Sequence, residues 1–521
     1  MNENTVSDPK LSFLENPNIP KTFLAINAAL AVVYFIVLAF WFPDSNRYLF
    51  WALIAGEVYH TWMALTFIQT VWNRGPVKRL FDKEFTPLVD VFITVAGEPV
   101  DVVEKTVVAA KNMDYPNFKI YLLNDGYVAH KDNWRDIIGL AKKHKVFSIT
   151  RRKPGGAKAG NINNGLRKTG SPLVVVFDAD HVPHPDFLKK TIGFFIDPKV
   201  GFVQSPQYYR NQDKNLVTAA AWDQQALFFG PILQGKDQMN SVTMCGTNMA
   251  ISRKALMEVG GICETNIAED FLTGLFLHER GWKSVYVPEV LAEGLAPEDL
   301  LSYSRQQFRW ARGSLEVLFR HNPLFKRGLS WKQKLQYLSS ASYFLSGAIV
   351  ALNAVLPLVF FYFGIVPLEI STMFLAIIFL PYIFFTVYLL RTVSNESFSF
   401  RALSFGMANF FVHIRALFVS ILGFKSAFQI TAKRGVSGKF IGLAIPHLIY
   451  FALLAVGLAI GLKREGLSVS LITNFSWAMF NAAVFIPYIN AAFIGVEAEG
   501  QELVGSKVRA INGTDTTPYA D

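Results

Sequence analysis

Two carboxylates at the end of an apolar run are the residues in this sequence best suited to chemistry. Asp178 and Asp180 close the run LVVVFDAD (173–180), and His181 follows them directly. Carboxylates spaced i, i+2 where an extended segment breaks can converge on one cation, and Mg²⁺ or Mn²⁺ prefers oxygen ligands of this kind. The motif therefore predicts a metal site. His181 is either a further ligand or an ordinary loop residue, and the alternative for the whole motif is a solvated loop.

A second acid and a glycine-rich segment indicate a nucleotide site. Asp125 precedes Gly126 and ends the run KIYLLND (119–125). The segment GGAKAGNIN (155–163) places small residues around Lys158, so that the backbone can approach a phosphate or base while the lysine neutralises its charge. The spacing is not that of a P-loop. The alternatives for these two segments are an Asp-Gly turn and a flexible surface loop.

Two further motifs lie on predicted helices. Glu269 and Asp270 precede a run with the pattern of a helix, FLTGLFLHERG. They contribute either a general base or the negative charge that helix N-termini favour. In the second helix the spacing i, i+3 places Gln306 and Arg309 on one face, beside Trp310. A guanidinium can clamp a diphosphate, and an indole ring can stack under a sugar.

These motifs need a sheet whose strand ends meet at one edge. The runs 89–96, 119–125 and 173–180 are short, apolar and rich in β-branched residues, with helix-length segments between them. Such runs are typical of buried parallel strands, and open α/β sheets bind ligands at the carboxyl ends of their strands. The sequence therefore predicts an α/β domain over residues 87–325 with its acids at the ligand-binding edge.

The composition excludes a single soluble enzyme. Hydrophobic residues make up 51% of the 521 residues and charged residues 17%, whereas soluble domains carry about 25% charged residues. Two cysteines, Cys245 and Cys263, cannot form a disulfide scaffold. The net charge of +10 is assigned to cytosolic flanks and anionic lipid rather than to nucleic acid, because the apolar residues gather in membrane-length runs.

Six runs are apolar and long enough to span a membrane, since roughly 20 helical residues cross a hydrocarbon core of about 30 Å. The segment 399–424 is broken by Arg401, His413 and Arg415, and we expect it to lie at the cytosolic interface as an amphipathic helix. If it spans instead, the last helices invert. Basic residues after the second run place the N-terminus and the α/β domain in the cytosol. The predicted spans are 21–41, 48–71, 337–363, 370–391, 439–462 and 468–495.

In this order, the motifs resemble those of the processive family-2 inverting membrane glycosyltransferases, most closely the bacterial cellulose synthase catalytic subunits. The shared series is D, D-x-D, E-D and Q-x-x-R-W, and it extends to KAGNIN (158–163) and DADHVP (178–183). The segment FQITAK (428–433) is similar to the family's F-x-V-T-x-K gating loop. Two positions depart: Ala268 stands where the family has threonine, and Asn124 where it has the first aspartate of D-D-G.

The resemblance implies an α/β GT-A catalytic domain, with a Rossmann-like, mostly parallel sheet, on the cytosolic face of a membrane channel. It implies that Asp178 and Asp180 hold Mg²⁺ or Mn²⁺ on the donor diphosphate and that Asp270 is the catalytic base, with Glu269 beside it. The residues expected to contact the UDP-sugar donor are Asp125, Lys158, Asp178, Gln306, Arg309, Thr431 and Lys433, and those expected to contact the acceptor are Trp310, Cys245, Gly246 and Thr247.

The implied function is processive transfer of a hexose from a UDP-sugar to a growing polysaccharide, which leaves through the protein's own channel. The favoured donor is UDP-glucose and the favoured product is a β-glucan such as cellulose. The alternatives are another β-glycan (a β-1,3- or mixed-linkage glucan, a mannan, or a chitin- or hyaluronan-like polymer) and a non-processive transferase with a lipid-linked acceptor. No PilZ domain is recognised, so direct cyclic-di-GMP control within the chain is not expected.

The expected organisation is that of a multi-pass protein of the inner or plasma membrane. Its partners would be the lipid bilayer and an accessory secretion subunit, with no nucleic acid. The expected segments are a cytosolic N-terminal segment (1–20), two transmembrane helices (21–73), the catalytic domain (87–325), transmembrane and interfacial helices (326–496) that include the gating loop (425–438), and a polar tail (497–521).

Overall fold

The computed structural model describes residues 9–424 and 435–496, and one of its two parts is built on a seven-stranded sheet. One strand, Met249–Ser252, is antiparallel to both of its neighbours, and the other pairs are parallel. The mostly parallel sheet expected from the sequence is thereby confirmed. The strands in spatial order are β3 (Phe147–Thr150), β2 (Phe118–Asn124), β1 (Val89–Val95), β4 (Leu173–Asp178), β8 (Met249–Ser252), β6 (Val200–Gln204) and β9 (Lys283–Tyr286).

The register of the parallel strands aligns their carboxyl ends. Val95 of β1 lies opposite Asn124 of β2, and Thr94 of β1 lies opposite Asp178, the last residue of β4. The three strands expected from the sequence are β1, β2 and β4. Asp125 and Asp178 therefore come to the same edge of the sheet, on either side of β1.

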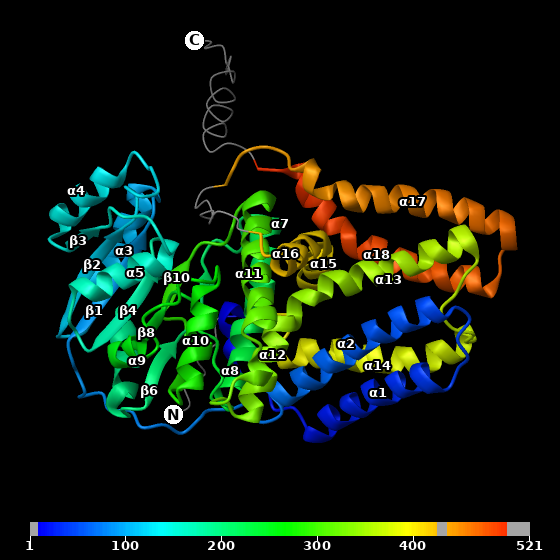
Figure 1. Ribbon diagram of the computed structural model, residues 1–521, viewed down its shortest axis with the longest axis horizontal. Coiled ribbons are helices and arrows are strands. Elements are labelled where there is room, and N and C mark those ends of the chain that lie inside the picture. The colour runs from blue at the N-terminus through cyan, green and yellow to red at the C-terminus, as the bar shows by residue number, and fades with distance from the viewer. Residues whose placement is uncertain (1–8, 425–434, 497–521) are drawn as a thin grey trace, which may run out of the picture.

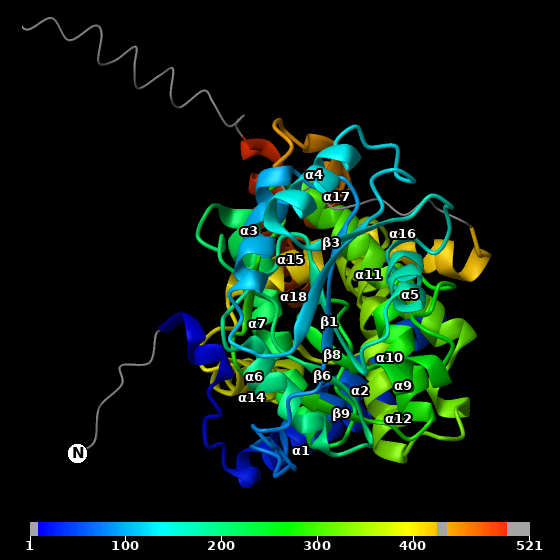
Figure 2. The ribbon, with the colours of Figure 1, turned by 90° about the vertical axis from the view of Figure 1, so that its left-hand side faces the viewer.

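Helices cover both faces of the sheet, because successive residues of its strands enter two different cores. Phe92 of β1 packs with Ile162 in one core, and its neighbours Val91 and Ile93 pack with Val103 in the other. The helices that carry Val103 and Ile162 lie on opposite sides of the sheet in Figure 2, as α3 and α5. The helices of this part are α3 (Val100–Lys111), α4 (Trp134–His144), α5 (Ala157–Lys168), α6 (Phe187–Thr191), α7 (Leu216–Leu227), α8 (Leu233–Asp237), α9 (Arg253–Glu258), α10 (Glu269–Glu279) and α11 (Leu300–Arg320).

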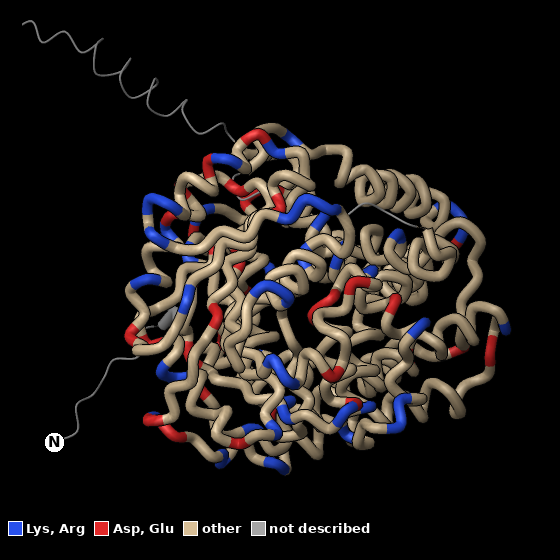
Figure 3. The backbone as a smooth tube through the Cα atoms, turned by 60° about the vertical axis from the view of Figure 1, so that its left-hand side comes forward, with Lys and Arg blue, Asp and Glu red and all other residues tan. Residues whose placement is uncertain are grey.

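Long helices form the second part and lie alongside one another (Figure 1). Among the described residues, five helices are long and apolar enough to cross a membrane, and a bent pair raises the number to six. Charged residues are spread over the sheet-bearing part, whereas the long helices carry them mainly near their ends (Figure 3). The helices of this part are α1 (Lys21–Phe40), α2 (Arg47–Val71), α12 (Trp331–Ser342), α13 (Ser346–Phe363), α14 (Thr372–Val393), α15 (Phe400–Ala408), α16 (Phe410–Leu422), α17 (Ile441–Glu465) and α18 (Val469–Ile494).

The second predicted span is the helix α2, but it is not among the five apolar helices. Glu57 and His60 interrupt its hydropathy near the middle. Glu57 has a partner, because the Tyr34 hydroxyl of α1 donates to its Oε1 at 3.4 Å, and the partly exposed His60 lies with Nδ1 3.6 Å from Glu57 Oε2. Glu57 is buried in protein, so α2 packs within the bundle in spite of its charge.

The predicted interfacial segment 399–424 consists of the pair α15 and α16, bent by 43°. Asn409 lies at the bend, where its amide nitrogen donates to the carbonyl of Phe405 at 2.9 Å and to the Tyr303 hydroxyl at 3.0 Å. A side chain that bonds the preceding turn is a known cause of helix bending. Figure 1 views this pair nearly end-on, so it runs across the long helices.

A cation at the end of α17 has a local function. Arg464 Nη2 donates to the carbonyl of Phe360 at 2.8 Å, and Nη1 donates to that of Phe361 at 3.1 Å. Both carbonyls belong to the last turn of α13, where backbone oxygens lack helical partners and attract positive charge. This capping accounts for a cation at that end of the bundle.

Candidate active site

Asp125 follows β2 and is held by an arginine. Its two carboxylate oxygens accept hydrogen bonds from Arg151 Nε at 2.8 Å and Nη2 at 2.5 Å. Arg151 also donates to the carbonyls of Gly155 and Ala157, at the start of the glycine-rich segment. Burial raises the pKa of Asp125, and the guanidinium opposes that shift. This arginine therefore fixes both predicted nucleotide-binding segments to each other.

Asp178 ends β4 and pairs with the lysine of the glycine-rich segment. Lys158 Nζ donates to Asp178 Oδ1 and, at 2.8 Å, to the carbonyl of Gly246. Thr94 Oγ1 donates to the same carboxylate oxygen at 3.1 Å, and the Asp178 amide donates to Thr247 Oγ1 at 2.9 Å. The structure thus brings together Asp178, Lys158 and the loop of Gly246 and Thr247, which the sequence analysis had assigned to donor and acceptor.

Asp180 and His181 lie deeper than Asp178. Asp180 is fully buried; its Oδ2 accepts from the Leu295 amide at 3.2 Å, and its Oδ1 lies 3.3 Å from His181 Nδ1. His181 Nε2 is buried and has no hydrogen-bond partner within the described ranges.

A metal ion at this edge would need ligands from outside the protein. Within residues 9–424 and 435–496, no group of three or more His, Cys, Asp or Glu side chains is placed to hold a metal. Mg²⁺ characteristically binds through one or two carboxylates and completes its shell with water and substrate phosphates. Asp178, which is partly exposed, and Asp180, which is fully buried, would supply the two carboxylates, and a diphosphate would be the remaining ligand.

Glu269 and Asp270 open α10 and face the same lysine. A Cβ on Gly246 would lie 2.7 Å from Asp270 Oδ2 and 3.4 Å from Lys158 Nζ. Burial and then the charge of Asp270 raise the pKa of Glu269 to about 7, while Lys158 and Arg309 oppose the rise. Burial likewise raises the pKa of Asp270. Two neighbouring carboxylates with raised pKa values, either of which could accept a proton, therefore lie near the cations of Lys158 and Arg309.

Lys158 joins the two acidic motifs electrostatically. Burial alone lowers the pKa of Lys158, but the charges of Asp178, Glu269 and Asp270 together raise it above its ordinary value. One ammonium group therefore lies in the field of both the D-x-D carboxylate and the E-D pair, which are separated by about 90 residues in the chain.

The Q-x-x-R-W motif lies on α11, between the two parts of the molecule (Figure 1). Gln306, Arg309 and Trp310 are half-buried, and Trp310 packs against the apolar cluster that joins α11 to α16. Gly313 allows α11 to approach the start of α10 closely, because a Cβ there would lie 2.4 Å from the Cβ of Ala268. This close approach brings the arginine near the E-D pair.

Hydrogen bonds from a buried glutamine fix the loop 245–247. Gln204 Oε1 accepts from the Cys245 amide at 3.0 Å, and Gln204 Nε2 donates to the carbonyl of Thr247 at 2.9 Å. Burial raises the pKa of the Cys245 thiol well above its usual value. The thiol is therefore neutral at physiological pH, and this residue contributes shape rather than a nucleophile.

Thr431 and Lys433 of the predicted gating loop lie outside the described residues. The segment that follows them reaches the start of α11, where the Val436 amide donates to Asp299 Oδ2 at 3.1 Å. Asp299 also caps α11. The described end of the predicted loop is therefore attached to the helix that carries the Q-x-x-R-W motif.

Two family models match the chain. The model described as glycosyltransferase-like family 2 matches residues 87–313, and the model described as cellulose synthase matches residues 257–438. The first covers the sheet and the candidate site. The second runs from α9 through the bundle to the segment that contains the predicted gating loop.

The chain is also similar to named cellulose synthase catalytic subunits (UDP-forming). It is 30% identical to that of Pseudomonas fluorescens (strain SBW25) over 92% of this chain and 68% of the relative. It is 38% identical to that of Xanthomonas axonopodis pv. citri over 57% of this chain and 41% of the relative. A solved mannosyltransferase from Pyrobaculum calidifontis, in complex with GDP-Man and Mn²⁺, has a TM-score of 0.46 at 17% identity, covering 75% of this chain and 99% of that one.

Proposed function

Since this chain belongs to the cellulose synthase family of membrane glycosyltransferases, we propose that it polymerises a UDP-hexose processively, with inversion at the anomeric carbon. UDP-glucose is the proposed donor and a β-glucan such as cellulose the proposed product, because the relatives with this name are UDP-forming cellulose synthases. The observation that carries the proposal is the shared lysine: Lys158 bonds Asp178 and lies in the field of Asp270. This shared lysine supports a site in which the donor and the base lie next to each other.

The donor would lie along the carboxyl edge of the sheet. Asp125, held by Arg151, is the proposed contact for the nucleoside, and Asp178 and Asp180 are the proposed ligands of Mg²⁺ or Mn²⁺. A bound divalent ion would supply positive charge to the leaving diphosphate. Lys158 supplies a second positive charge at the same place.

Asp270 is the proposed catalytic base. It would accept the proton of the acceptor hydroxyl as the oxygen attacks the anomeric carbon, a contribution of about 10²–10⁴-fold in rate. Lys158 and Arg309 both favour its ionised form. Arg309 would also stabilise the charge that develops on the departing diphosphate, and Trp310 would stack under the acceptor sugar.

The product would leave through the bundle next to α11. Buried polar atoms without hydrogen-bond partners in the described ranges gather here: Ser302 Oγ on α11, Asn409 Oδ1 at the bend, and both ring nitrogens of His413 on α16. Unpaired polar groups are costly in a bilayer. Sugar hydroxyls both donate and accept, so a glycan passing beside α11 and α16 could satisfy them. Export to the cell exterior, with the catalytic part in the cytosol and an accessory secretion subunit as partner, belongs to the same proposal.

The test is UDP release by the full-length chain reconstituted into vesicles and offered each UDP-sugar with Mg²⁺ or Mn²⁺. We expect turnover with UDP-glucose, an insoluble product that a β-1,4-specific glucanase digests, and loss of turnover in Asp270→Asn. The Asp136→Asn variant, altered at an exposed acid of α4, is the matched control. Turnover that gives only a single-sugar lipid product would refute processivity, and turnover unchanged in Asp270→Asn would refute the assigned base.

A further inference from the structure

The connection between α11 and α12 is basic and free of acids. Between residues 317 and 368 the sequence has five cations and no Asp or Glu. Three of the cations precede the 33-residue apolar helical segment Trp331–Phe363, which is long enough to cross a membrane, and the other two lie in its first turn. These cations are Arg320, Lys326, Arg327, Lys332 and Lys334.

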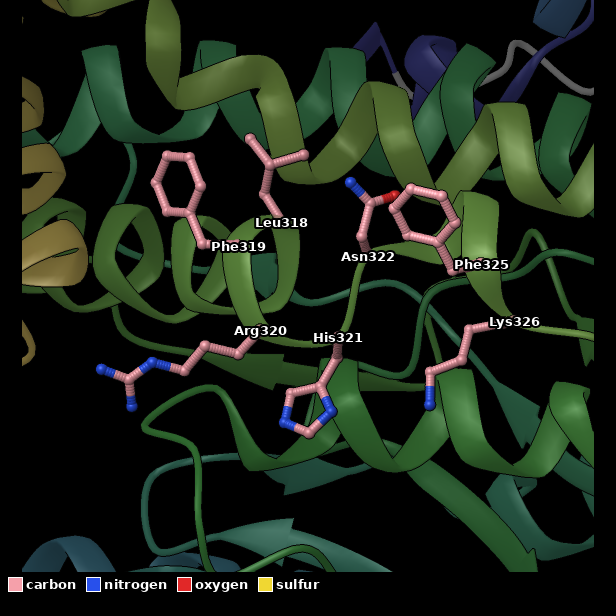
Figure 4. A pocket seen from close by; sticks show the side chains of 7 residues that line it. All are labelled: Leu318, Phe319, Arg320, His321, Asn322, Phe325 and Lys326. Carbon is pink, nitrogen blue, oxygen red and sulfur yellow. The ribbon is translucent and has the colours of Figure 1, made fainter.

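An open pocket of about 420 Å³ lies at this connection, and its lining is divided by polarity. Figure 4 shows the side chains of Arg320, His321 and Lys326 along one side and those of Leu318, Phe319, Asn322 and Phe325 along the other. The pocket thus offers Arg320 and Lys326 opposite a mainly apolar wall.

The two cations on this side differ in their partners, because in the described part of the chain only Lys326 is paired with a carboxylate. Lys326 Nζ lies 3.2 Å from Glu279 Oε2 of α10, and within the described residues no carboxylate forms an ion pair with Arg320 or His321. Burial and the charges of Lys326 and Arg320 lower the pKa of His321. The field inside the pocket is therefore positive and favours an anion.

The apolar side is exposed at the level where the membrane segment begins. Phe325 is 83% exposed and Trp331 is 65% exposed. Aromatic side chains beside basic ones at the end of a membrane span are typical of the headgroup region of a bilayer. A soluble anion would bind the cations but would leave these rings in water, whereas a phospholipid would cover both.

We propose that this pocket binds one anionic phospholipid of the cytosolic leaflet, with its headgroup along the side formed by Arg320, His321 and Lys326 and its acyl chains along Phe319 and Phe325. Basic pockets on the cytoplasmic side of membrane helices are suited to such headgroups. The site lies at the last turn of α11, the helix that carries Gln306, Arg309 and Trp310 in its first half. Occupancy would therefore hold in place a helix used at the candidate active site, and UDP release would be faster in anionic membranes.

The test uses the full-length chain in nanodiscs of phosphatidylcholine alone or mixed with phosphatidylglycerol. Native mass spectrometry after gentle detergent release would count the phosphatidylglycerol that stays bound. We expect one retained molecule in the unaltered chain and about tenfold weaker retention in the double variant Arg320→Gln, Lys326→Gln, since each cation near a membrane surface contributes measurably to anionic-lipid binding. Lys142→Gln, at an exposed lysine of α4 in the sheet-bearing part, is the matched control.

A charge-preserving pair, Arg320→Lys with Lys326→Arg, separates loss of the site from misfolding, and it should retain the lipid. The proposal would be overturned if the double glutamine variant kept as much phosphatidylglycerol as the unaltered chain. It would equally be overturned if inorganic phosphate displaced the lipid as effectively as added phosphatidylglycerol, because the site would then recognise a free anion. Neither result depends on whether the chain polymerises glucose.

Discussion

The substitution Gly246→Ala tests the geometry of the candidate active site most directly. An added Cβ would lie 2.7 Å from Asp270 Oδ2, while ordinary contacts begin at 3.4 Å. The carboxylate would have to retreat by about 0.7 Å, and displacements on the order of 1 Å at a reacting group can cost about 10²-fold in rate. We therefore expect kcat for UDP release to fall by about two orders of magnitude.

The same substitution also strains the backbone, so the control must carry the same strain. Gly246 has φ +78° and Gly260 has φ +86°, but a Cβ on Gly260 meets no atom within 4 Å. A left-handed conformation costs an alanine roughly 1–2 kcal/mol at either site. Gly260→Ala should lose that stability and keep its activity.

The assay is steady-state UDP release from reconstituted protein, with thermal unfolding in detergent measured on the same samples. Both variants should unfold at similarly reduced temperatures, and only Gly246→Ala should lose turnover. Equal turnover in the two variants at matched stability would refute the placement of Asp270 beside Gly246, and with it the shared lysine on which the proposed function depends.

Three further predictions concern charge. The pKa of Glu269 is raised to about 7 and that of Asp270 is raised as well, so UDP release should fall as the pH drops through about 7. Glu269→Gln removes a negative charge next to Asp270 and should therefore move this fall in rate to lower pH. A pH–rate profile that does not move in Glu269→Gln would contradict the coupling of the two acids. Arg151→Gln leaves Asp125 buried without its cation and should cost about 3–5 kcal/mol of stability. The pKa of Asp125 in the folded state would then rise further, so the loss of stability in Arg151→Gln should shrink as the pH falls and Asp125 becomes protonated. The control is Arg152→Gln, at the exposed neighbouring residue, which should not change the unfolding temperature at any pH. Removal of divalent ions with a chelator should abolish UDP release, and added Mg²⁺ or Mn²⁺ should restore it. Asp178→Asn should need a far higher metal concentration for the same UDP release. Turnover that resists the chelator would rule out the proposed role of the metal.

The strands and acids that sequence reasoning found are those with strong local patterns. The strands β1 and β4 are buried along almost their whole length and β2 is buried over its second half, so the acids that follow β2 and end β4 stand out against an apolar background. The edge strand β3 was missed, since it has only four residues and Phe147 at its start is 55% exposed. Arg151 follows that strand, so its pairing with Asp125 was missed as well.

The remaining parts of the site depend on contacts between distant segments. Thr94 bonds Asp178 across 84 residues, and Gly313 approaches Ala268 across 45 residues. No local spacing marks such partners, because their side chains meet only when strands and helices pack. The bend at Asn409 has the same origin: its amide bonds Tyr303 of α11, a hundred residues earlier, and the sequence analysis had predicted one helix there.

The position of α11 has a practical consequence for anyone dividing this protein. The helix packs along α16 through Ala311 and Leu315, and it continues almost to residue 325, where the catalytic domain was expected to end. A fragment truncated there would expose an apolar stripe along α11. Chimaeras that exchange catalytic domains between relatives should therefore transfer α16 together with α11, because the seam between enzyme and membrane lies inside a helix pair and not in a loop.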